Sequence, residues 1–166
     1  MNLHQLGAFL TEIIFQADLV ENASNRLKDS IDEFDNIGTW SAIQSILISS
    51  SNISKILWPK RKYAKRGEEL RTLLKIDSKC ILKSRQFRNI FEHYDDFIND
   101  FFEDKGSYSY TDFVMNPSLQ SFGMQSCHRG YNTFNNTLII HGKVLELNEI
   151  IDRVNEVRHK CKNQFL

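Results

Sequence analysis

The chain has few of the residues that mark the more specialised classes of protein. Its 166 residues include two prolines and three cysteines, and its 21 lysines and arginines are balanced by 21 aspartates and glutamates. A domain that coats nucleic acid is normally basic, so any contact with nucleic acid must be confined to a patch. A net charge near zero also does little to oppose self-association.

Cysteine spacing and apolar runs exclude further classes. Cys80, Cys127 and Cys161 are widely spaced and form no CxxC pair, which argues against a disulfide framework or a zinc knuckle. The first 15 residues, MNLHQLGAFLTEIIF, contain Glu12 and no basic segment, unlike a signal peptide. No run approaches the roughly 20 apolar residues of a membrane span. We therefore expect one cytoplasmic domain over 1–166, without membrane contact, metal or cofactor.

Apolar residues in the first third of the chain recur at helical spacing. The seam from Leu3 to Phe34 predicts a long helix over 3–35. It packs in a bundle or pairs with a second copy, and the bundle is favoured. Thr39 is a candidate N-cap for a helix over 39–57, which Pro59 ends. The remaining helices are expected over 67–75, 79–104 and 148–163.

The segment 108–147 has a different pattern, with aromatic and β-branched residues. Residues 131–140 and 143–147 flank His141-Gly142, which is typical of a hairpin turn. We expect a β-hairpin or a short antiparallel sheet of two or three strands in this insertion. The predicted fold class is therefore mainly α, with a small β-rich insertion before the last helix.

The stretch from Ser84 to Phe102, SRQFRNIFEHYDDFINDFF, has a broad aromatic side and a polar side. The polar side gathers Arg85, Arg88, Asn89, Glu92, His93 and Asp96. A guanidinium can hold a phosphate by two parallel hydrogen bonds, and an imidazole can take or give a proton near neutral pH. Together with a positioning amide, these groups suffice for RNA cleavage without metal, in which the substrate's 2′-hydroxyl is the nucleophile.

A purely structural interpretation applies to the same residues, and one further candidate site lies on the last expected helix. Arg88 and Glu92 are an i,i+4 pair on what can be a solvated helix face, and His93 can pair similarly with Asp96. Glu156 and His159 have the Glu-x-x-His spacing of carboxylate metal sites in helical bundles. No other helix supplies a matching pair, so we expect no metal site there.

A basic segment, WPKRKYAKRG, follows the second expected helix. Cations and aromatic rings alternate in it in a way that suits RNA. The candidate RNA-binding residues are Lys60, Arg61, Lys62, Tyr63, Lys65 and Arg66. The alternative is a solvated loop between helices, which is favoured when the segment is taken by itself.

The spacing Arg88-Asn89-Ile90-Phe91-Glu92-His93 resembles the Arg-x4-His motif of HEPN-domain ribonucleases, with a polar residue after the arginine. The wider pattern ILWP…RGEELR…RQFRNIFEHYDD, over about residues 40–100, is similar to a group of bacterial HEPN-like proteins. The resemblance implies an antiparallel helical bundle that forms a homodimer, in which two motif helices face each other across one composite cleft.

The same resemblance implies an endoribonuclease of toxin–antitoxin or phage-defence systems, with Arg88 and His93 as the catalytic pair and Asn89 as the polar residue. Arg88 would bind the scissile phosphate, His93 would transfer the proton, and Asn89 would orient the site. Glu92, Arg85 and Asp96 are supporting candidates. The alternative is a non-catalytic HEPN-like module that dimerises and regulates a partner, such as a nucleotidyltransferase-type antitoxin or another defence component.

Overall fold

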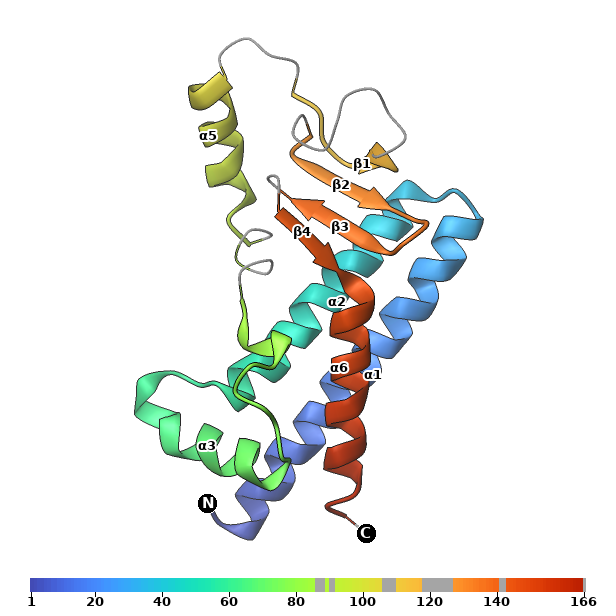
Figure 1. Cartoon of the computed structure of the whole chain (residues 1–166). Helices are drawn as coiled ribbons and strands as arrows, with labels where there is room; N and C mark the ends of the chain where they lie inside the picture. The colour runs from blue at the N-terminus through green and yellow to red at the C-terminus, as the bar shows by residue number, and fades with distance from the viewer. Residues whose placement is uncertain (86–88, 90–91, 106–109, 118–126, 141–142, 166) are drawn as a thin grey trace. The chain divides into compact units, whose positions relative to one another are not determined.

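The computed structural model describes residues 1–85, 89, 92–105, 110–117, 127–140 and 143–165 (Figure 1). The chain forms two compact units. Unit 1 comprises residues 1–85 and 149–166, and unit 2 comprises residues 86–148. The expected fold class, mainly helical with a small sheet before the last helix, is confirmed.

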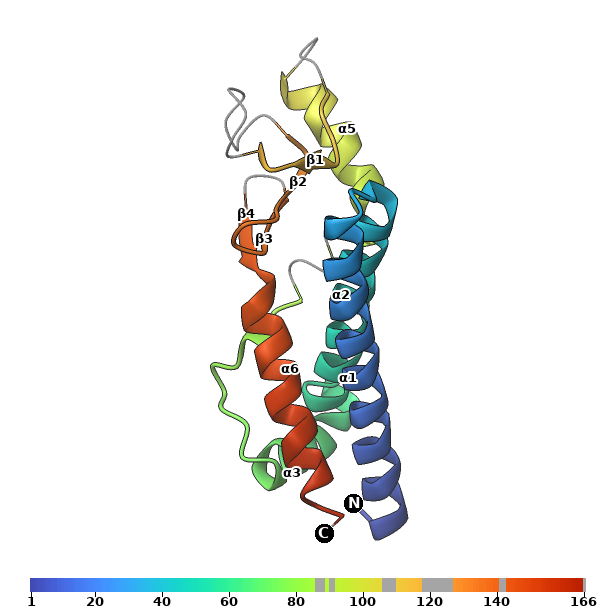
Figure 2. The ribbon, with the colours of Figure 1, turned by 90° about the vertical axis from the view of Figure 1, so that its right-hand side faces the viewer.

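Two long helices form the body of unit 1. α1 (Leu3–Asp32) and α2 (Asn36–Leu57) lie side by side (Figure 2). Asn52 donates a hydrogen bond to Gln16 at 3.2 Å, and Arg26 donates one to Ser45 at 3.4 Å. Both helices bury leucine and isoleucine side chains between them, and four serines of α2 are buried as well. The small serine side chains allow the two helices to approach closely.

The junction between α1 and α2 corrects one expectation. The N-cap of α2 is Asp35, whose carboxylate accepts a hydrogen bond from the N–H of Gly38 at 2.9 Å. Thr39 lies buried inside the first turn of the helix and does not cap it. A carboxylate at the N-cap satisfies a helix N–H and also complements the positive end of the helix dipole, so the helix begins three residues earlier.

The rest of unit 1 covers the C-terminal end of α2 and one side of α1. It consists of a 3-10 turn η1 (Arg61–Tyr63), α3 (Ala64–Leu73), a second 3-10 turn η2 (Ile81–Lys83) and α6 (Leu147–Lys162). In Figure 2, α6 runs beside the pair of long helices. The buried guanidinium of Arg158 on α6 joins it to α1, with hydrogen bonds to Asp18 at 2.9 Å and to Glu21 at 2.5 and 3.1 Å.

The helix expected over 79–104 is wrong at its N-terminal end. Residues 81–83 form a 3-10 turn, and Ser84 has extended backbone with φ −72° and ψ 128°. The described helix is α5 (Tyr94–Lys105), preceded by helical backbone at Asn89 and Glu92. Cys80 and Leu82 are buried on either side of an intermediate Ile81, a two-residue alternation that an α-helix would not give.

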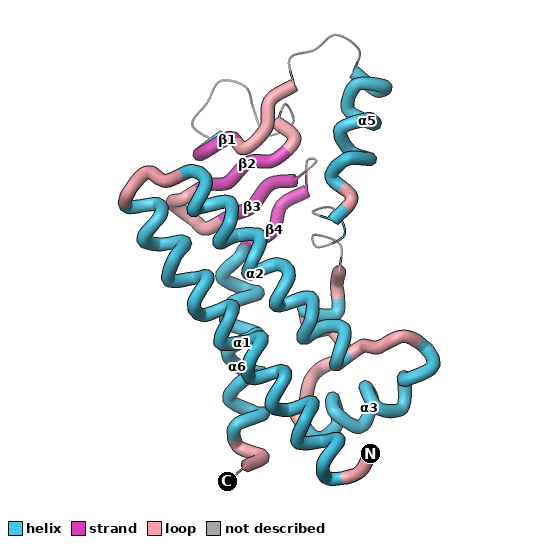
Figure 3. The backbone as a smooth tube through the Cα atoms, turned by 180° about the vertical axis from the view of Figure 1, so that it is seen from behind, coloured by secondary structure: helices cyan, strands magenta, loops and turns pink. Residues whose placement is uncertain are grey.

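Unit 2 contains a four-stranded mixed sheet in the order β1-β2-β3-β4, which Figure 3 shows in magenta. The strands are β1 (Val114–Met115), β2 (Arg129–Asn132), β3 (Thr137–Ile140) and β4 (Lys143–Glu146). β2, β3 and β4 are antiparallel, and β1 is parallel to β2. Ile140 pairs with Lys143, so the hairpin expected around 141–142 is confirmed, although these two residues lie outside the described ones.

The sheet differs from the expectation in two respects. Residues 131–140 form two strands separated by a turn, and a fourth strand makes the sheet mixed instead of antiparallel. The turn ends at Asn136, whose φ of 53° is in the left-handed region that asparagine tolerates. The side chain of Asn136 accepts a hydrogen bond from the buried Tyr131 hydroxyl at 2.6 Å and so fixes the turn against β2.

The aromatic side of α5 packs within unit 2, as its pattern predicted. The ring of Phe101 is buried, and its centre lies 5.1 Å from the centre of the Tyr110 ring. The centre of the Phe97 ring lies 6.5 Å from that of the buried His128. Phe102 stacks on Tyr110 at 5.6 Å. Among the described helices of the chain, none has the length and apolar character needed to cross a membrane.

Candidate functional site

The described part of the Arg-x4-His motif is open to solvent. Asn89 has helical backbone and is exposed, and its carbonyl accepts a hydrogen bond from the backbone N–H of His93 at 2.9 Å. Residues one turn apart on a helix share a face, so these two polar side chains are neighbours. The His93 side chain is 64% exposed. Arg88, the third member of the predicted catalytic set, lies outside the described residues.

One carboxylate lies close to His93. Its Nδ1 lies 3.8 Å from a carboxylate oxygen of Asp96, which is itself 71% exposed. Further exposed acids on the same element are Glu92, Asp95, Asp100 and Glu103. Asp96 can orient the imidazole, but the acidic surface as a whole repels a polyanion. An RNA that approached this helix would need cations from elsewhere.

Three arginines converge on the C-terminal end of α2, where helix carbonyls lack partners within the helix. Arg66 donates hydrogen bonds to the carbonyls of Lys55 and Ile56 at 3.4 and 3.3 Å, and Arg71 donates to that of Leu57. Arg85, a candidate phosphate contact, donates to the carbonyl of Trp58. Cations are favourable at this end of a helix, so these guanidiniums have a structural role that the sequence did not reveal.

The other cations of the basic segment have a different environment. Lys60, Arg61, Lys62 and Lys65 are exposed, and the Tyr63 side chain among them is also exposed. Within the described part of the chain, the side chains of Lys60, Arg61 and Lys65 form no hydrogen bond or ion pair. Of the six candidate RNA-binding residues, Arg66 is therefore hydrogen-bonded to the end of α2, and the other five are exposed on the surface.

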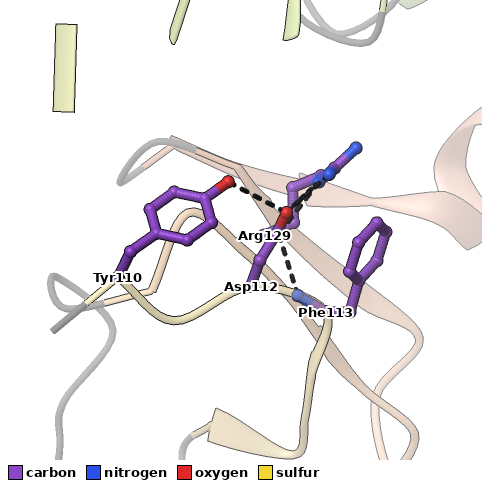
Figure 4. Close-up of polar contacts among 4 residues, drawn as sticks. All are labelled: Tyr110, Asp112, Phe113 and Arg129. Carbon is purple, nitrogen blue, oxygen red and sulfur yellow. Dashed lines mark hydrogen bonds and ion pairs between the residues drawn. The ribbon is translucent and has the colours of Figure 1, made fainter. Parts of the chain in front are cut away.

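Sequence reasoning missed a buried polar cluster in unit 2, shown in Figure 4. Nε of Arg129 donates to Asp112 at 2.9 and 3.2 Å, and its Nη2 donates at 2.5 Å. Both side chains are about nine-tenths buried, with 10% and 11% exposed. The same carboxylate accepts hydrogen bonds from the Tyr110 hydroxyl at 3.0 Å and from the N–H of Phe113 at 2.8 Å.

The electrostatics of this cluster follow from burial and pairing. Burial by itself raises the pKa of Asp112, but the hydrogen bonds and charge of Arg129 outweigh it, so the pKa lies below its ordinary value. Burial, together with the neighbouring Asp112 charge, raises the pKa of Tyr110 to about 12. The guanidinium also lies 4.0 Å from the Phe113 ring centre and 5.8 Å from that of Tyr94. An arginine that is nine-tenths buried and paired with a carboxylate has a structural partner in the fold, so we do not count Arg129 among the candidate phosphate contacts.

One signal in the sequence could have revealed the cluster. Tyr110, Asp112 and Phe113 place a carboxylate within an aromatic stretch, and Arg129 precedes a run of strand residues. A charge between buried residues needs a partner of opposite sign, so the two could have been matched. The two residues are 17 positions apart in sequence, which hides the pairing from any local pattern.

Neither thiols nor metal ligands offer a competing site. All three cysteines are free and buried, and burial raises the pKa of the Cys161 thiol to about 12, which leaves it protonated and unreactive. Among the described residues, no group of three or more histidine, cysteine or acidic side chains could hold a metal ion. Arg153 and Lys160 both pair with Glu156, the residue that the Glu-x-x-His spacing had singled out.

Comparisons with known proteins found no match for the chain among protein-family models, curated proteins or solved structures. Fold and site define a mainly helical protein with an inserted mixed sheet, in which the exposed Asn89 and His93 are joined by one backbone hydrogen bond. The resemblance to HEPN proteins therefore rests on the sequence alone, that is, on the motif and on the wider pattern over about residues 40–100.

Proposed function

We propose that the chain is a metal-independent endoribonuclease of the HEPN type. It acts in the cytoplasm, in a toxin–antitoxin or phage-defence setting, and its active site is completed at a homodimer interface. The observation that carries the proposal is the exposed pair formed by Asn89 and His93 on one helical face, directly after Arg88 in the sequence.

The proposed reaction uses only groups of the RNA and of this motif. The 2′-oxygen attacks the adjacent phosphorus and loses its proton to solvent, and the bond from phosphorus to the 5′-oxygen breaks. The protonated imidazole of His93 gives its proton to the departing 5′-oxygen and regains one from solvent, so the proton count balances. The products are a 2′,3′-cyclic phosphate and a 5′-hydroxyl. Water is not a reactant, and the proposed step uses no metal ion. Arg88 holds the phosphate oxygens, His93 supplies a proton to the departing 5′-oxygen, and Asn89 positions either group. Asp96 orients the imidazole from 3.8 Å.

The test is cleavage of end-labelled single-stranded and structured RNA by the purified protein in EDTA. We expect 2′,3′-cyclic phosphate ends from the wild type, and a loss of about 100-fold or more in rate for His93→Ala and Arg88→Ala. His159→Ala, at an exposed histidine of α6, is the matched control and should cleave normally. Identical rates for the wild type and His93→Ala would refute the catalytic role.

A second function, a non-catalytic HEPN-like dimerisation and binding module, is favoured by the charge distribution around the motif. Exposed acids cover α5, and Arg85 is bonded to the Trp58 carbonyl instead of facing a ligand. Such a module would regulate a partner protein, such as a nucleotidyltransferase-type antitoxin. It predicts a dimer that cleaves none of the RNAs in EDTA and remains a dimer after His93→Ala.

A further inference from the structure

The ring of Tyr63 lies at the surface of unit 1 and is contacted from within the unit by Arg66. The guanidinium carbon of Arg66 lies 5.5 Å from the centre of this ring and 4.4 Å from the centre of the Phe9 ring on α1. Arg66 is held in turn by the carbonyls of Lys55 and Ile56. An arginine anchored to a helix end and to a second ring thus supports Tyr63 from within the unit.

The Tyr63 side chain is half-exposed, and cations precede and follow it in the chain. Tyr63 is 49% exposed, and the Lys62 ammonium lies 5.4 Å from its centre. Lys60, Arg61 and Lys65 are exposed within a stretch of six residues, and their side chains form no hydrogen bond or ion pair in the described structure, although the charge of Lys65 acts on Glu69. Arg66 and Arg71 are bonded to carbonyls at the end of α2, whereas these exposed cations are open to solvent and therefore accessible to a ligand.

The geometry points to a binding site for single-stranded RNA at Tyr63, where one base stacks on the exposed ring and Lys60, Arg61, Lys62 and Lys65 contact the flanking phosphates. A single strand of RNA repeats two groups, a flat base and a phosphate. The aromatic ring can stack on the base, and the exposed cations can contact the phosphates. A duplex hides its base faces and would use the cations alone. Lys62 is exposed, so its ammonium can leave the ring for a phosphate when a base stacks.

This inference takes its choice of RNA from the proposed function, but the site does not require cleavage. Binding is therefore measured on a strand that cannot react. The probe is a fluorescein-labelled 2′-O-methyl oligouridine of about 10 nucleotides, within the usual site size for such surfaces. Without a free 2′-hydroxyl this probe cannot be cleaved by the proposed reaction, and fluorescence anisotropy then reports binding alone.

The ring is tested by three substitutions of one residue. Tyr63→Phe should bind within about twofold of the wild type, because stacking is kept. Tyr63→Ala and Tyr63→Leu should each bind about tenfold more weakly or worse, because both remove the π face. Leucine retains apolar bulk over Arg66, so it separates loss of stacking from loss of packing. Circular dichroism establishes that each variant is folded.

The cations are tested by matched triple substitutions. Replacing Lys60, Lys62 and Lys65 by Gln should lower the slope of log affinity against log salt by about 2, since each phosphate contact on a single strand contributes about 0.7. The control replaces Lys28, Lys79 and Lys143 by Gln, three exposed lysines elsewhere, with the same change in net charge. The control should leave the slope unchanged.

Any of three results with nucleic acid would overturn the inference. They are equal binding by the wild type and Tyr63→Ala, equal loss in the two triple variants, and equal affinity for a duplex of the same length. Binding to phosphatidylserine vesicles without binding to the oligonucleotide would also overturn it, in favour of a lipid surface. A protein that binds through Tyr63 but cleaves nothing retains this site and loses the proposed catalysis. Normal binding of the probe by His93→Ala keeps the two questions separate.

Discussion

The ion pair between Asp112 and Arg129 shows what single residues contribute to unit 2. Replacing Asp112 by Asn keeps the volume but leaves a buried guanidinium without its counter-charge. Removing one partner of such a pair typically costs about 3 to 5 kcal/mol, and we expect a loss of this order in urea unfolding. Asp100→Asn, at an exposed acid of α5, is the control and should change stability by less than about 0.5 kcal/mol.

The same pair makes stability depend on pH in a definite direction. The pKa of Asp112 is lower in the folded protein than its ordinary 3.8, because the charge and hydrogen bonds of Arg129 outweigh burial. A carboxyl group whose pKa is lower in the folded than in the unfolded protein contributes fully to the free energy of unfolding above about pH 4. This contribution is lost as pH falls through the folded pKa. The stability difference between wild type and Asp112→Asn should therefore be constant from pH 7 to 5 and shrink below pH 4. A difference that stays constant down to pH 3 would contradict this linkage.

Residue patterns predicted exposure and burial better than they predicted partners. The aromatic face of α5 and the exposed position of His93 follow from helical spacing, which acts over three or four residues. The pairing of Asp112 with Arg129, and that of Arg66 with the end of α2, join residues far apart in sequence. Such contacts depend on how elements pack, so neither could be predicted from local spacing.

At the scale of elements, Arg158 joins α6 to α1. A second arginine of α6, Arg153, allows a buried ion pair to be compared with a half-exposed one on the same helix. Arg158 is 8% exposed and bonds Asp18 and Glu21, whereas Arg153 pairs with Glu156 at a half-exposed position on the same helix. Arg158→Leu should cost about 1 to 3 kcal/mol, the scale of hydrogen bonds to charged groups. Arg153→Leu should cost less than about 1 kcal/mol. Equal effects in thermal unfolding would show that burial does not decide the strength of these pairs.

The contact of α3 with the end of α2 depends on a glycine. A Cβ atom on Gly67 would lie 2.4 Å from Cδ of Pro59 and 2.7 Å from the carbonyl oxygen of Leu57, both too close. Gly67→Ala should therefore destabilise the protein by about 1 to 3 kcal/mol, although alanine is the better helix former. Gly7→Ala, in α1 with nothing within 4 Å, should stabilise it by up to about 1 kcal/mol. Urea unfolding of both variants measures the contrast, and a destabilised Gly7→Ala would contradict the reasoning.

Long helices were predictable because their apolar period repeats many times, as in α1. Short elements were not, since the four-residue strands β2 and β3 were taken as one segment and the helix expected from residue 79 gave way to a 3-10 turn. Their boundaries depend on single residues, such as Asn136 with its positive φ and Ser84 with its extended backbone. In the sequence, a single residue of this kind is only weak evidence for a boundary, because several neighbouring residues favour continuing the helix or strand.

At the scale of the whole molecule, the neutral net charge conceals a division between the two units. Unit 1 contains 17 lysines and arginines against 13 aspartates and glutamates, and unit 2 contains 4 against 8. The units therefore carry about +4 and −4, a separation that composition alone could not show. Opposite charges of this size attract unit 1 of one copy to unit 2 of another, while a zero net charge leaves no repulsion between whole molecules.

We therefore expect association between copies that weakens with salt, since exposed charges are screened over about 10 Å at 0.1 M ionic strength. Replacing Asp95, Asp96 and Asp100 by Asn brings unit 2 close to neutral and should weaken association at low salt, as measured by sedimentation. Replacing Asp29, Asp32 and Glu33 of unit 1 by amides gives the same net charge but keeps the units opposite, so association should persist. If both variants dissociated alike, net charge alone would govern the assembly. If neither dissociated and salt had no effect, the copies would be held by apolar contact, as with the exposed Phe15 and Leu19 of α1.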